Sequence, residues 1–161
     1  MAHTDPYLDW TGQPVAAFPQ KITPGASAFV LNDKGELLLQ KRADNGHWCM
    51  PGGRMDPGES IAQTCVREVW EETGLCVHIK RLIGVYSEPR DYAIATYPDG
   101  NMNQLLSLSF ECELVGGELT LSHEGTDLGF YPLDALPQPM LLTHKIRIKD
   151  ALKHLPTPVI R

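Results

Sequence analysis

Residues 53–75 read GRMDPGESIAQTCVREVWEETGL, a loop that leads into a helix. Ser60 is a preferred N-cap residue, and Gln63, three positions later, completes a capping box. Gly74 is the residue type that ends a helix in the left-handed conformation. This pattern predicts a helix over residues 61–73. On a wheel of about 100° per residue, the stripe expected to face the core consists of Ala62, Val66, Val69 and Thr73.

The same helix carries an acidic group formed by Glu68, Glu71 and Glu72. Side chains three and four positions apart are neighbours on a helix, and each like-charged pair repels by about 0.2–0.5 kcal/mol. Arg67 can neutralise only one of these charges. Taken alone, such a group is most often a solvated acidic face, so a functional interpretation depends on the residues in front of the helix.

Two glycines, Gly52 and Gly53, stand in a Pro-Gly-Gly turn before the helix. Because they have no side chains, they let backbone carbonyl groups face inward. Carboxylates together with backbone carbonyls form an all-oxygen donor set, which suits Mg²⁺ or Mn²⁺ better than zinc. Such ions neutralise a diphosphate and can acidify a bound water for attack on phosphorus.

The fixed residues of this stretch form the pattern G-x5-E-x7-R-E-U-x-E-E-x-G-U, in which U is aliphatic. Seven fixed identities coincide by chance about once in 10⁸–10⁹ starting points. The pattern resembles the signature of the Nudix hydrolases, and residues 48–53 and 130–136 also resemble that family. The resemblance implies an α/β fold, an α/β/α sandwich around a mixed central β-sheet. It also implies a pyrophosphatase that hydrolyses the acid anhydride linkage of a nucleoside diphosphate derivative.

The resemblance implies catalytic roles for Arg67, Glu68, Glu71, Glu72 and Glu124. Glu68 and Glu72 are expected to be the main ligands of Mg²⁺, for which Mn²⁺ can substitute. Glu71 is expected to join them when further ions bind with the substrate. Arg67 is expected to orient the carboxylates.

Residues outside the helix complete the expected site. The Gly52 carbonyl is expected to be a metal ligand, and Gly53 and Glu59 to support the loop, Glu59 through Arg67 or the helix. A later loop commonly supplies the general base or an extra ligand in this family. Glu124 occupies the matching position, and Asp127 is its competitor, because geometry decides which carboxylate acts as a base.

Substrate choice is expected to depend on residues 87–103, because a loop of 17 residues in a compact domain is usually functional. ADP-ribose hydrolases of the family tend to have a proline near the position of Pro89. Dinucleoside polyphosphate hydrolases tend to have a tyrosine near the position of Tyr92, so the two markers point to different substrates. Arg42 is a third candidate for substrate binding, because arginine binds phosphate with two parallel hydrogen bonds. In each case an ordinary surface or core role is the competing interpretation.

Two other functions remain open from the sequence. The same signature serves enzymes that remove oxidised nucleoside triphosphates, and some proteins of this fold are nucleotide-binding regulatory modules. Such modules typically lose signature carboxylates, whereas this chain keeps all three glutamates of the helix. Isopentenyl-diphosphate isomerases share the fold but need a catalytic cysteine and histidine ligands, and residues 53–75 contain no histidine.

The length of 161 residues favours one domain. Residues 1–24 contain four prolines and are expected to form an extended arm packed on a single domain at residues 25–161. The remaining expected elements are a hairpin of residues 26–31 and 36–40 around a turn at 32–35, strands at 77–86, 105–114, 118–122 and 129–131, and a helix at 142–153.

Charge and hydropathy limit the classes of partner that the protein is expected to bind. With 14 Lys and Arg against 20 Asp and Glu, the formal charge is −6, and an acidic surface repels nucleic-acid phosphates. No apolar stretch approaches the roughly 20 residues that span a bilayer, and residues 1–10 lack the features of a secretory signal. We therefore expect a cytoplasmic protein that binds a small nucleotide substrate and has no membrane or dedicated nucleic-acid surface.

Three smaller expectations concern packing. The four cysteines are spaced without a C-x-x-C pair and are expected to be buried, reduced thiols. The basic residues of the helix at 142–153 are expected to form a solvated face. Leu141 and Leu142 fit either the core or an interface in a homodimer.

Overall fold

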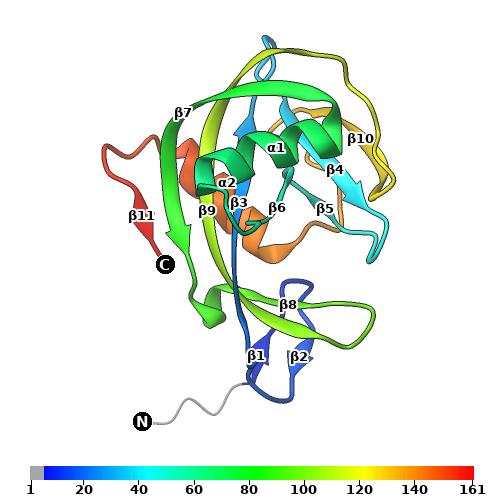
Figure 1. Cartoon of the computed structure of the whole chain (residues 1–161), viewed down its shortest axis with the longest axis vertical. Coiled ribbons are helices and arrows are strands. Elements are labelled where there is room, and N and C mark those ends of the chain that lie inside the picture. The colour runs from blue at the N-terminus through cyan, green and yellow to red at the C-terminus, as the bar shows by residue number, and fades with distance from the viewer. Residues whose placement is uncertain (1–5) are drawn as a thin grey trace.

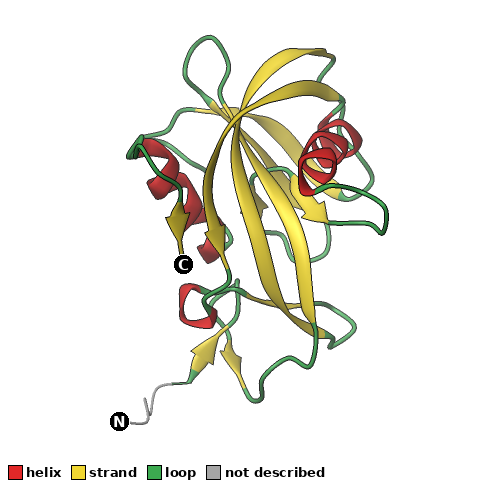
Figure 2. Cartoon of the chain, turned by 60° about the vertical axis from the view of Figure 1, so that its left-hand side comes forward, coloured by secondary structure: helices red, strands yellow, loops and turns green. Residues whose placement is uncertain are grey.

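The computed structural model describes residues 6–161, and its centre is a six-stranded mixed sheet (Figure 1). The strands lie in the order β11-β7-β9-β3-β6, and β8 pairs with β9. Their bounds are β3 Ile22–Val30, β6 Gly52–Arg54, β7 Leu75–Tyr86, β8 Ile94–Thr96, β9 Met102–Gly117 and β11 Val159–Ile160. Helix α1 (Ile61–Thr73) covers one face and α2 (Leu142–Leu152) covers the other (Figure 2). This arrangement confirms the expected α/β/α sandwich.

The sheet is mixed because β3 runs parallel to β9, whereas β6 and β7 run antiparallel to their neighbours β3 and β9. The strands expected at residues 77–86 and 105–114 are present within β7 and β9, and β9 is central, as its nearly continuous apolar sequence predicts. Apolar side chains of these strands pack against Cys65 and Val69 of α1 to form one buried cluster.

The turn expected at residues 32–35 is present, but the two segments around it do not form a hairpin ladder. They share a single bridge between Leu31 and Leu37 and then enter different sheets. Strand β3 pairs with β9 along residues 22–30, whereas the second segment takes other partners. The second segment instead belongs to a three-stranded antiparallel sheet of β10 (Gly125–Tyr131), β4 (Leu37–Arg42) and β5 (Trp48–Cys49).

Helix α1 has the predicted bounds and caps. The Ser60 side chain accepts a hydrogen bond from the Gln63 backbone N–H, the capping box is complete, and Gly74 ends the helix at φ 71°. The expected core stripe is wrong in part, because Ala62 is exposed and Val66 is 38% exposed. The helix is rotated so that two of its glutamates face a cavity, which moves the buried side toward Thr64, Cys65, Val69, Glu72 and Thr73.

The strand expected at residues 118–122 is absent. The backbone N–H groups of Glu118 and Thr120 donate to the carbonyls of Gly74 and Thr73, so this segment satisfies the end of α1 instead of pairing with a strand. The strand expected at residues 129–131 is the last part of β10, which begins at Gly125.

Residues 87–103 contain more structure than the expected loop. A 3₁₀ helix, η1 (Pro89–Asp91), precedes β8, and Ala93, Ile94 and Ala95 are buried. Ala93 and Ala95 pack with Trp10 of the N-terminal segment and Leu105 of β9. A short run of this kind has too few residues to show a period, which explains why the pattern did not predict it.

The expectation of a solvated basic face on α2 is wrong for two residues. His144 and Arg147 are 7% and 2% exposed, because α2 packs them against the sheet. Lys149 is exposed. Leu141 is completely buried within the core of this chain.

The N-terminal segment forms two short paired strands, β1 (Tyr7–Leu8) and β2 (Pro14–Val15), and buries Trp10 against the domain. Strand β3 begins at Ile22 and so includes the last residues of the segment expected to be an arm, whose residues 1–5 lie outside the described range.

All four cysteines are free, as expected, and three are buried. Cys76 is the exception, because its side chain points outward from β7. Among the described residues, no helix has the length and apolar character needed to cross a bilayer.

Candidate active site

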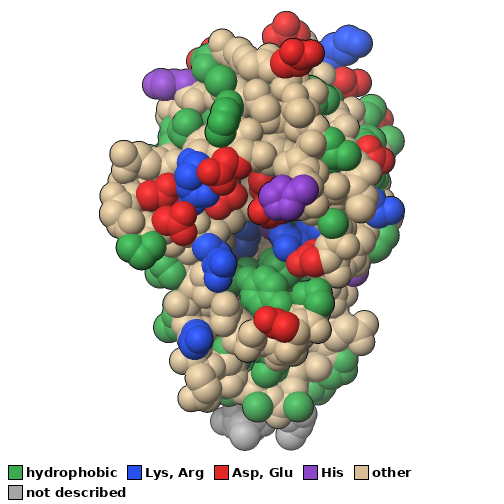
Figure 3. All heavy atoms as spheres, turned by 45° about the vertical axis from the view of Figure 1, so that its right-hand side comes forward, with side chains coloured by type: hydrophobic (Ala, Val, Ile, Leu, Met, Phe, Trp, Pro, Cys, Tyr) green, Lys and Arg blue, Asp and Glu red, His purple; other side chains and the backbone are tan. Residues whose placement is uncertain are grey.

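A cavity of about 1060 Å³ opens where the glycine turn, α1 and the arm meet the sheet. Figure 3 shows it as a hollow, with acidic side chains on its upper rim, basic side chains within it and apolar side chains below. Its walls come from β3, β6, α1, α2 and residues 97–107, together with Trp10 and Glu124. Segments that are far apart in the sequence therefore enclose one space of the size that small-molecule sites usually have.

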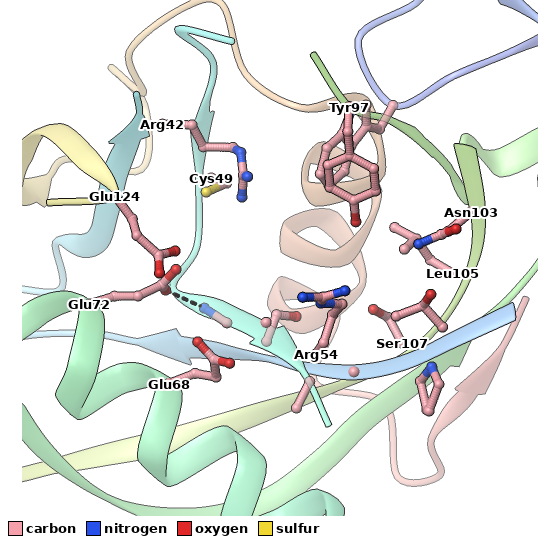
Figure 4. Close-up of a pocket in the computed structure, with 18 of the residues that line it drawn as sticks. Arg42, Cys49, Arg54, Glu68, Glu72, Tyr97, Asn103, Leu105, Ser107 and Glu124 are labelled. Atoms are coloured by element: carbon pink, nitrogen blue, oxygen red, sulfur yellow. Dashed lines mark hydrogen bonds between the residues drawn. The ribbon is translucent and has the colours of Figure 1, made fainter. Parts of the chain in front are cut away.

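An acidic cluster of Glu68, Glu71, Glu72 and Glu124 lines one side of this cavity. Figure 4 shows the carboxylates of Glu72 and Glu124 directed toward each other, with Glu68 beside them. Glu72 is the most buried member at 4% exposed, and its Oε2 accepts a hydrogen bond from the Gly52 N–H at 2.8 Å. The helix rotation that places Ala62 outside the core thus brings these carboxylates together.

Burial makes ionisation of this cluster costly. Burial, together with the charges of Glu68 and Glu124, raises the pKa of Glu72 to about 8, although the hydrogen bond from Gly52 opposes this rise. Burial also raises the pKa of Glu68, although Arg67 opposes this rise. Within residues 6–161, Glu72 makes no ion pair. A buried carboxylate without a cation is the expected state of a metal ligand before the ion binds.

Arg67 joins the loop to the acidic cluster. Its Nη1 donates to Glu68 at 2.9 Å and to Glu71 at 3.0 Å. Its Nη2 donates to Glu59 and to the Arg54 carbonyl, both at 3.0 Å. The guanidinium holds the pKa of Glu59 down at about 2, so Glu59 remains ionised and paired. Arg67 therefore fixes two carboxylates of the cluster while it ties down the loop.

The glycine turn admits no larger residues. A Cβ on Gly53 would lie 2.5 Å from the Glu68 carboxylate. A Cβ on Gly52, which has φ 153°, would overlap the backbone of Ala26 and Ser27. The two glycines thus allow β6 to pass close to both β3 and the acidic cluster.

The two candidate loop carboxylates occupy different environments. Glu124 lines the cavity, whereas Asp127 lies in β10, is exposed and is not among the lining residues. The geometry favours Glu124 for any role beside the other glutamates.

The three candidate substrate contacts are also divided. Arg42 lines the cavity, where its guanidinium forms a fork with Asp44 at 2.8 and 2.6 Å. Pro89 and Tyr92 are not among the lining residues, because η1 carries them toward β1. The tyrosine of this segment that lines the cavity is Tyr97.

Among the lining residues that sequence reasoning missed are Trp10, Tyr97, His144 and Arg147. Trp10 and Tyr97 pack edge to face with ring centroids 5.6 Å apart, and the Arg42 guanidinium lies 5.1 Å from the Trp10 ring. Length and aromatic content of residues 87–103 indicated the segment but not the residue. No sequence signal distinguishes a buried arginine on α2 from its exposed neighbours.

The donor set fits a hard divalent cation. Carboxylate oxygens converge at the cavity wall beside the glycine turn, and no histidine or thiol belongs to the cluster, which matches Mg²⁺ or Mn²⁺. Among residues 6–161, no three acidic, histidine or cysteine side chains lie in an arrangement that could hold a metal ion by themselves. In general, Mg²⁺ takes few protein ligands and completes its shell with water and substrate phosphates.

Comparisons with known proteins agree with this geometry. The sequence model of the NUDIX domain matches residues 21–155. The chain is 34% identical over 128 residues to an ADP-ribose pyrophosphatase of Methanocaldococcus jannaschii, covering 77% of this chain and 70% of that protein. It is 48% identical over 68 residues to a putative 8-oxo-dGTP diphosphatase of Bacillus subtilis, covering 42% of this chain and 46% of that protein. The crystal structure of an ADP-ribose pyrophosphatase from Streptococcus suis superposes with a TM-score of 0.64 at 26% identity, covering 86% of this chain and 97% of that one.

Proposed function

The chain belongs to the Nudix family of hydrolases, and from this membership we propose that it cleaves the diphosphate linkage of a nucleoside diphosphate derivative with Mg²⁺ as cofactor. The observation that carries the proposal is the buried, unpaired Glu72 beside Glu68 and Glu124 on the wall of a large cavity. Such a cluster repels a diphosphate unless cations stand between them.

The residues of the acidic cluster and the glycine turn have separate roles in this proposal. Glu68, Glu72 and the Gly52 carbonyl would hold Mg²⁺ or Mn²⁺, and Glu71 would contribute once substrate is present. The bound cation neutralises the diphosphate and acidifies water. Arg67 acts on the cluster indirectly, because its hydrogen bonds to Glu68 and Glu71 set the direction in which their carboxylates point.

Glu124 is proposed as the general base. Its carboxylate faces Glu72 in the cavity and lies on a different segment from α1. It could therefore accept a proton from an attacking water while the glutamates of α1 hold the metal ion. Its side chain is more accessible than that of Glu72, which makes proton exchange with solvent straightforward. Hydrolysis adds the hydroxyl of water to one phosphorus and leaves the second phosphate on the departing group.

The aromatic wall favours a nucleotide with a base. Trp10 and Tyr97 line the end of the cavity away from the acidic cluster, and aromatic rings at a site mouth can pack against a base. We place ADP-ribose and nucleotide sugars first, since two of the similar proteins are named ADP-ribose pyrophosphatases. An oxidised nucleoside triphosphate is the second candidate, because the 48% identity to a putative 8-oxo-dGTP diphosphatase favours it.

A product analysis tests both. The protein is incubated with ADP-ribose, a nucleotide sugar, a dinucleoside polyphosphate or 8-oxo-dGTP, with Mg²⁺ or with EDTA. The Glu72→Gln protein serves as the blank. The proposal expects AMP and ribose 5-phosphate from ADP-ribose, with Mg²⁺ only and from wild type only. Preferential release of pyrophosphate from 8-oxo-dGTP selects the second candidate. No product from any member of the panel with folded protein would favour a nucleotide-binding module instead.

A further inference from the structure

The cavity contains a buried positive charge that forms no ion pair with any acidic residue of the described range, 6–161. Arg147 is 2% exposed and lines the cavity from α2, on the opposite face of the sheet from α1. Its Nη1 and Nη2 donate to the hydroxyls of Ser27 at 3.3 Å and Thr143 at 3.1 Å. Its Nε has no hydrogen-bond partner among the described residues. Burial lowers the pKa of Arg147 to about 10, which reflects the cost of a charge with no counter-ion.

The other cations of the cavity are balanced within residues 6–161. Arg42 is paired with Asp44, and Arg67 with the glutamates. Lys21 and Arg54 are exposed, so water can balance their charges. Asp150, a buried acidic residue of α2, forms ion pairs with Arg161 and Lys153. Arg147 alone among the lining cations described is both buried and without a carboxylate.

A second donor stands beside it. His144, three residues earlier on α2, lines the same cavity and is 7% exposed. Its Nδ1 accepts a hydrogen bond from the Met50 N–H at 3.1 Å, so Nδ1 carries no proton and the neutral ring bears its proton on Nε2. No hydrogen bond from Nε2 occurs among the described residues. Burial and the charges of Arg147 and Arg42 keep the pKa of His144 well below its ordinary value, which maintains this neutral donor.

We propose that Arg147 and His144 form an oxyanion subsite at the inner end of the cavity, which binds a phosphoryl group of the substrate from the face of the sheet opposite the acidic cluster. A guanidinium presents paired N–H donors to tetrahedral oxyanions. The neighbouring lining residues Ser27 and Ser107 are small and leave space above it. That the oxyanion is part of a nucleotide rests on the proposed function.

The register of the sheet supports this placement. Ser27, which accepts from Arg147, is the pairing partner of Gly52 in the β3–β6 ladder. The Gly52 N–H in turn donates to Glu72. Adjacent strands lie about 4.8 Å apart, so Arg147 and Glu72 are connected across a single strand pair.

Phosphate binding without catalysis provides the first test. Wild type, Arg147→Met and Lys149→Met are titrated with inorganic phosphate in EDTA at constant ionic strength, with chloride as the reference anion. The readouts are the melting temperature and the side-chain Nε–H resonance of Arg147. Lys149→Met is the matched control, because it removes one positive charge from an exposed position of the same helix.

The proposal expects phosphate to raise the melting temperature of wild type and Lys149→Met, to shift the Arg147 Nε–H resonance, and to bind Arg147→Met at least about tenfold more weakly. Arg147→Met removes a buried charge, but it also removes the contact of the guanidinium with the Tyr86 ring at 5.5 Å and the hydrogen bonds to Ser27 and Thr143, so each protein's own melting temperature without phosphate is the baseline for its titration. Equal phosphate binding by wild type and Arg147→Met, or no binding by wild type, overturns the proposal. If Arg147→Met fails to fold, Arg147→Lys is used instead, because lysine keeps the positive charge but loses the paired N–H donors of the guanidinium. Unchanged phosphate binding by Arg147→Lys would also overturn the proposal.

Kinetics identify the source of the oxyanion. With ADP-ribose and Mg²⁺, Arg147→Met should raise KM about tenfold or more and change kcat little, and phosphate should compete with substrate in wild type only. Phosphate that binds through Arg147 but does not compete shows a site for the free anion and overturns the substrate assignment. Arg147-dependent phosphate binding in a protein that hydrolyses no panel substrate would leave the subsite standing and remove the proposed function.

Discussion

Replacement of Glu72 by glutamine separates the charge of this side chain from its shape. Glutamine is nearly isosteric and can still accept the hydrogen bond from the Gly52 N–H, so the packing around a residue that is 4% exposed is retained. What changes is the ionisation. Burial raises the pKa of Glu72 from 4.5 to about 8, whereas the unfolded chain ionises near the lower value.

The sign of the effect follows from proton binding. Below about pH 4.5 both states hold the proton and the charge makes no difference. Between about pH 4.5 and pH 8 the folded state keeps a proton that the unfolded state releases, so the free energy of unfolding falls as pH rises. At about 1.4 kcal/mol per pH unit, the cost to the metal-free folded state at pH 7 is on the order of 3 kcal/mol. Glutamine avoids this cost.

Thermal unfolding in EDTA measures the difference. A domain of this size shifts by about 2–4 °C per kcal/mol, so Glu72→Gln should melt about 6–12 °C above wild type at pH 7 and equal it near pH 4.5. Mg²⁺ should raise the melting temperature of wild type and have little effect on the variant, because the anionic ligand is gone. Turnover should fall at least about a hundredfold.

The matched control is Glu71→Gln, because the Glu71 side chain is 49% exposed and water screens its charge. Its melting temperature in EDTA should stay close to that of wild type at both pH values. Either of two results would refute the reasoning about Glu72: near-wild-type turnover by a folded Glu72→Gln protein, or melting temperatures in EDTA that do not separate as pH rises.

Three further comparisons test the site. Glu124→Gln should lower kcat at least about tenfold and Asp127→Asn should leave it nearly unchanged, since only the first carboxylate lines the cavity; steady-state kinetics would show the reverse order if the base were misassigned. Gly53→Ala places a methyl carbon 2.5 Å from a carboxylate of the acidic cluster, so kcat should fall about tenfold or more at an unchanged fold by circular dichroism, and full activity would contradict the tight fit. Tyr97→Ala should raise KM several-fold and Tyr92→Ala should not, because Tyr97 lines the cavity; equal KM values for both variants would remove Tyr97 from the substrate wall.

The predictable part of the fold is the part that is encoded locally. Helix α1 was predicted to the residue because its caps, Ser60, Gln63 and Gly74, act within one turn of the chain. The rotation of that helix is not predicted by the sequence. A helical wheel ranks side chains by polarity and therefore places Glu68 and Glu72 on the solvent-facing side. Their burial in a cavity wall depends on β6 and β3, which the helix sequence does not encode.

Non-local pairing accounts for the fold errors. The turn at residues 32–35 is encoded by its own residues, but whether the flanking strands pair depends on the partners that each of them meets, and β4 pairs with β10 and β5. Similarly, the segment at residues 118–122 finds its hydrogen-bond partners at the end of α1, about 45 positions earlier in the sequence. Propensity describes such segments as strands, and the tertiary context decides otherwise.

In the candidate site, too, the residues that lie close together in the sequence were predicted and those from separate segments were not. The acidic cluster was predicted because most of it lies within one contiguous motif, and the structure places Glu124 beside it. The substrate wall was missed because Trp10, Tyr97 and Arg147 come from three segments, none with a pattern of its own. The expectation for Tyr92 counts residues from the motif and so assumes that the following loop has the same path in every member of the family. Here η1 and β8 give the segment a different path.

One strand pair links the two charged ends of the cavity. Gly52 donates to Glu72, and its pairing partner Ser27 accepts from Arg147. The acidic cluster and Arg147 are therefore linked through the paired backbone of β3 and β6. In the proposed function, this strand pair joins the groups that would meet the phosphates, and Trp10 and Tyr97 line the same cavity from two other segments.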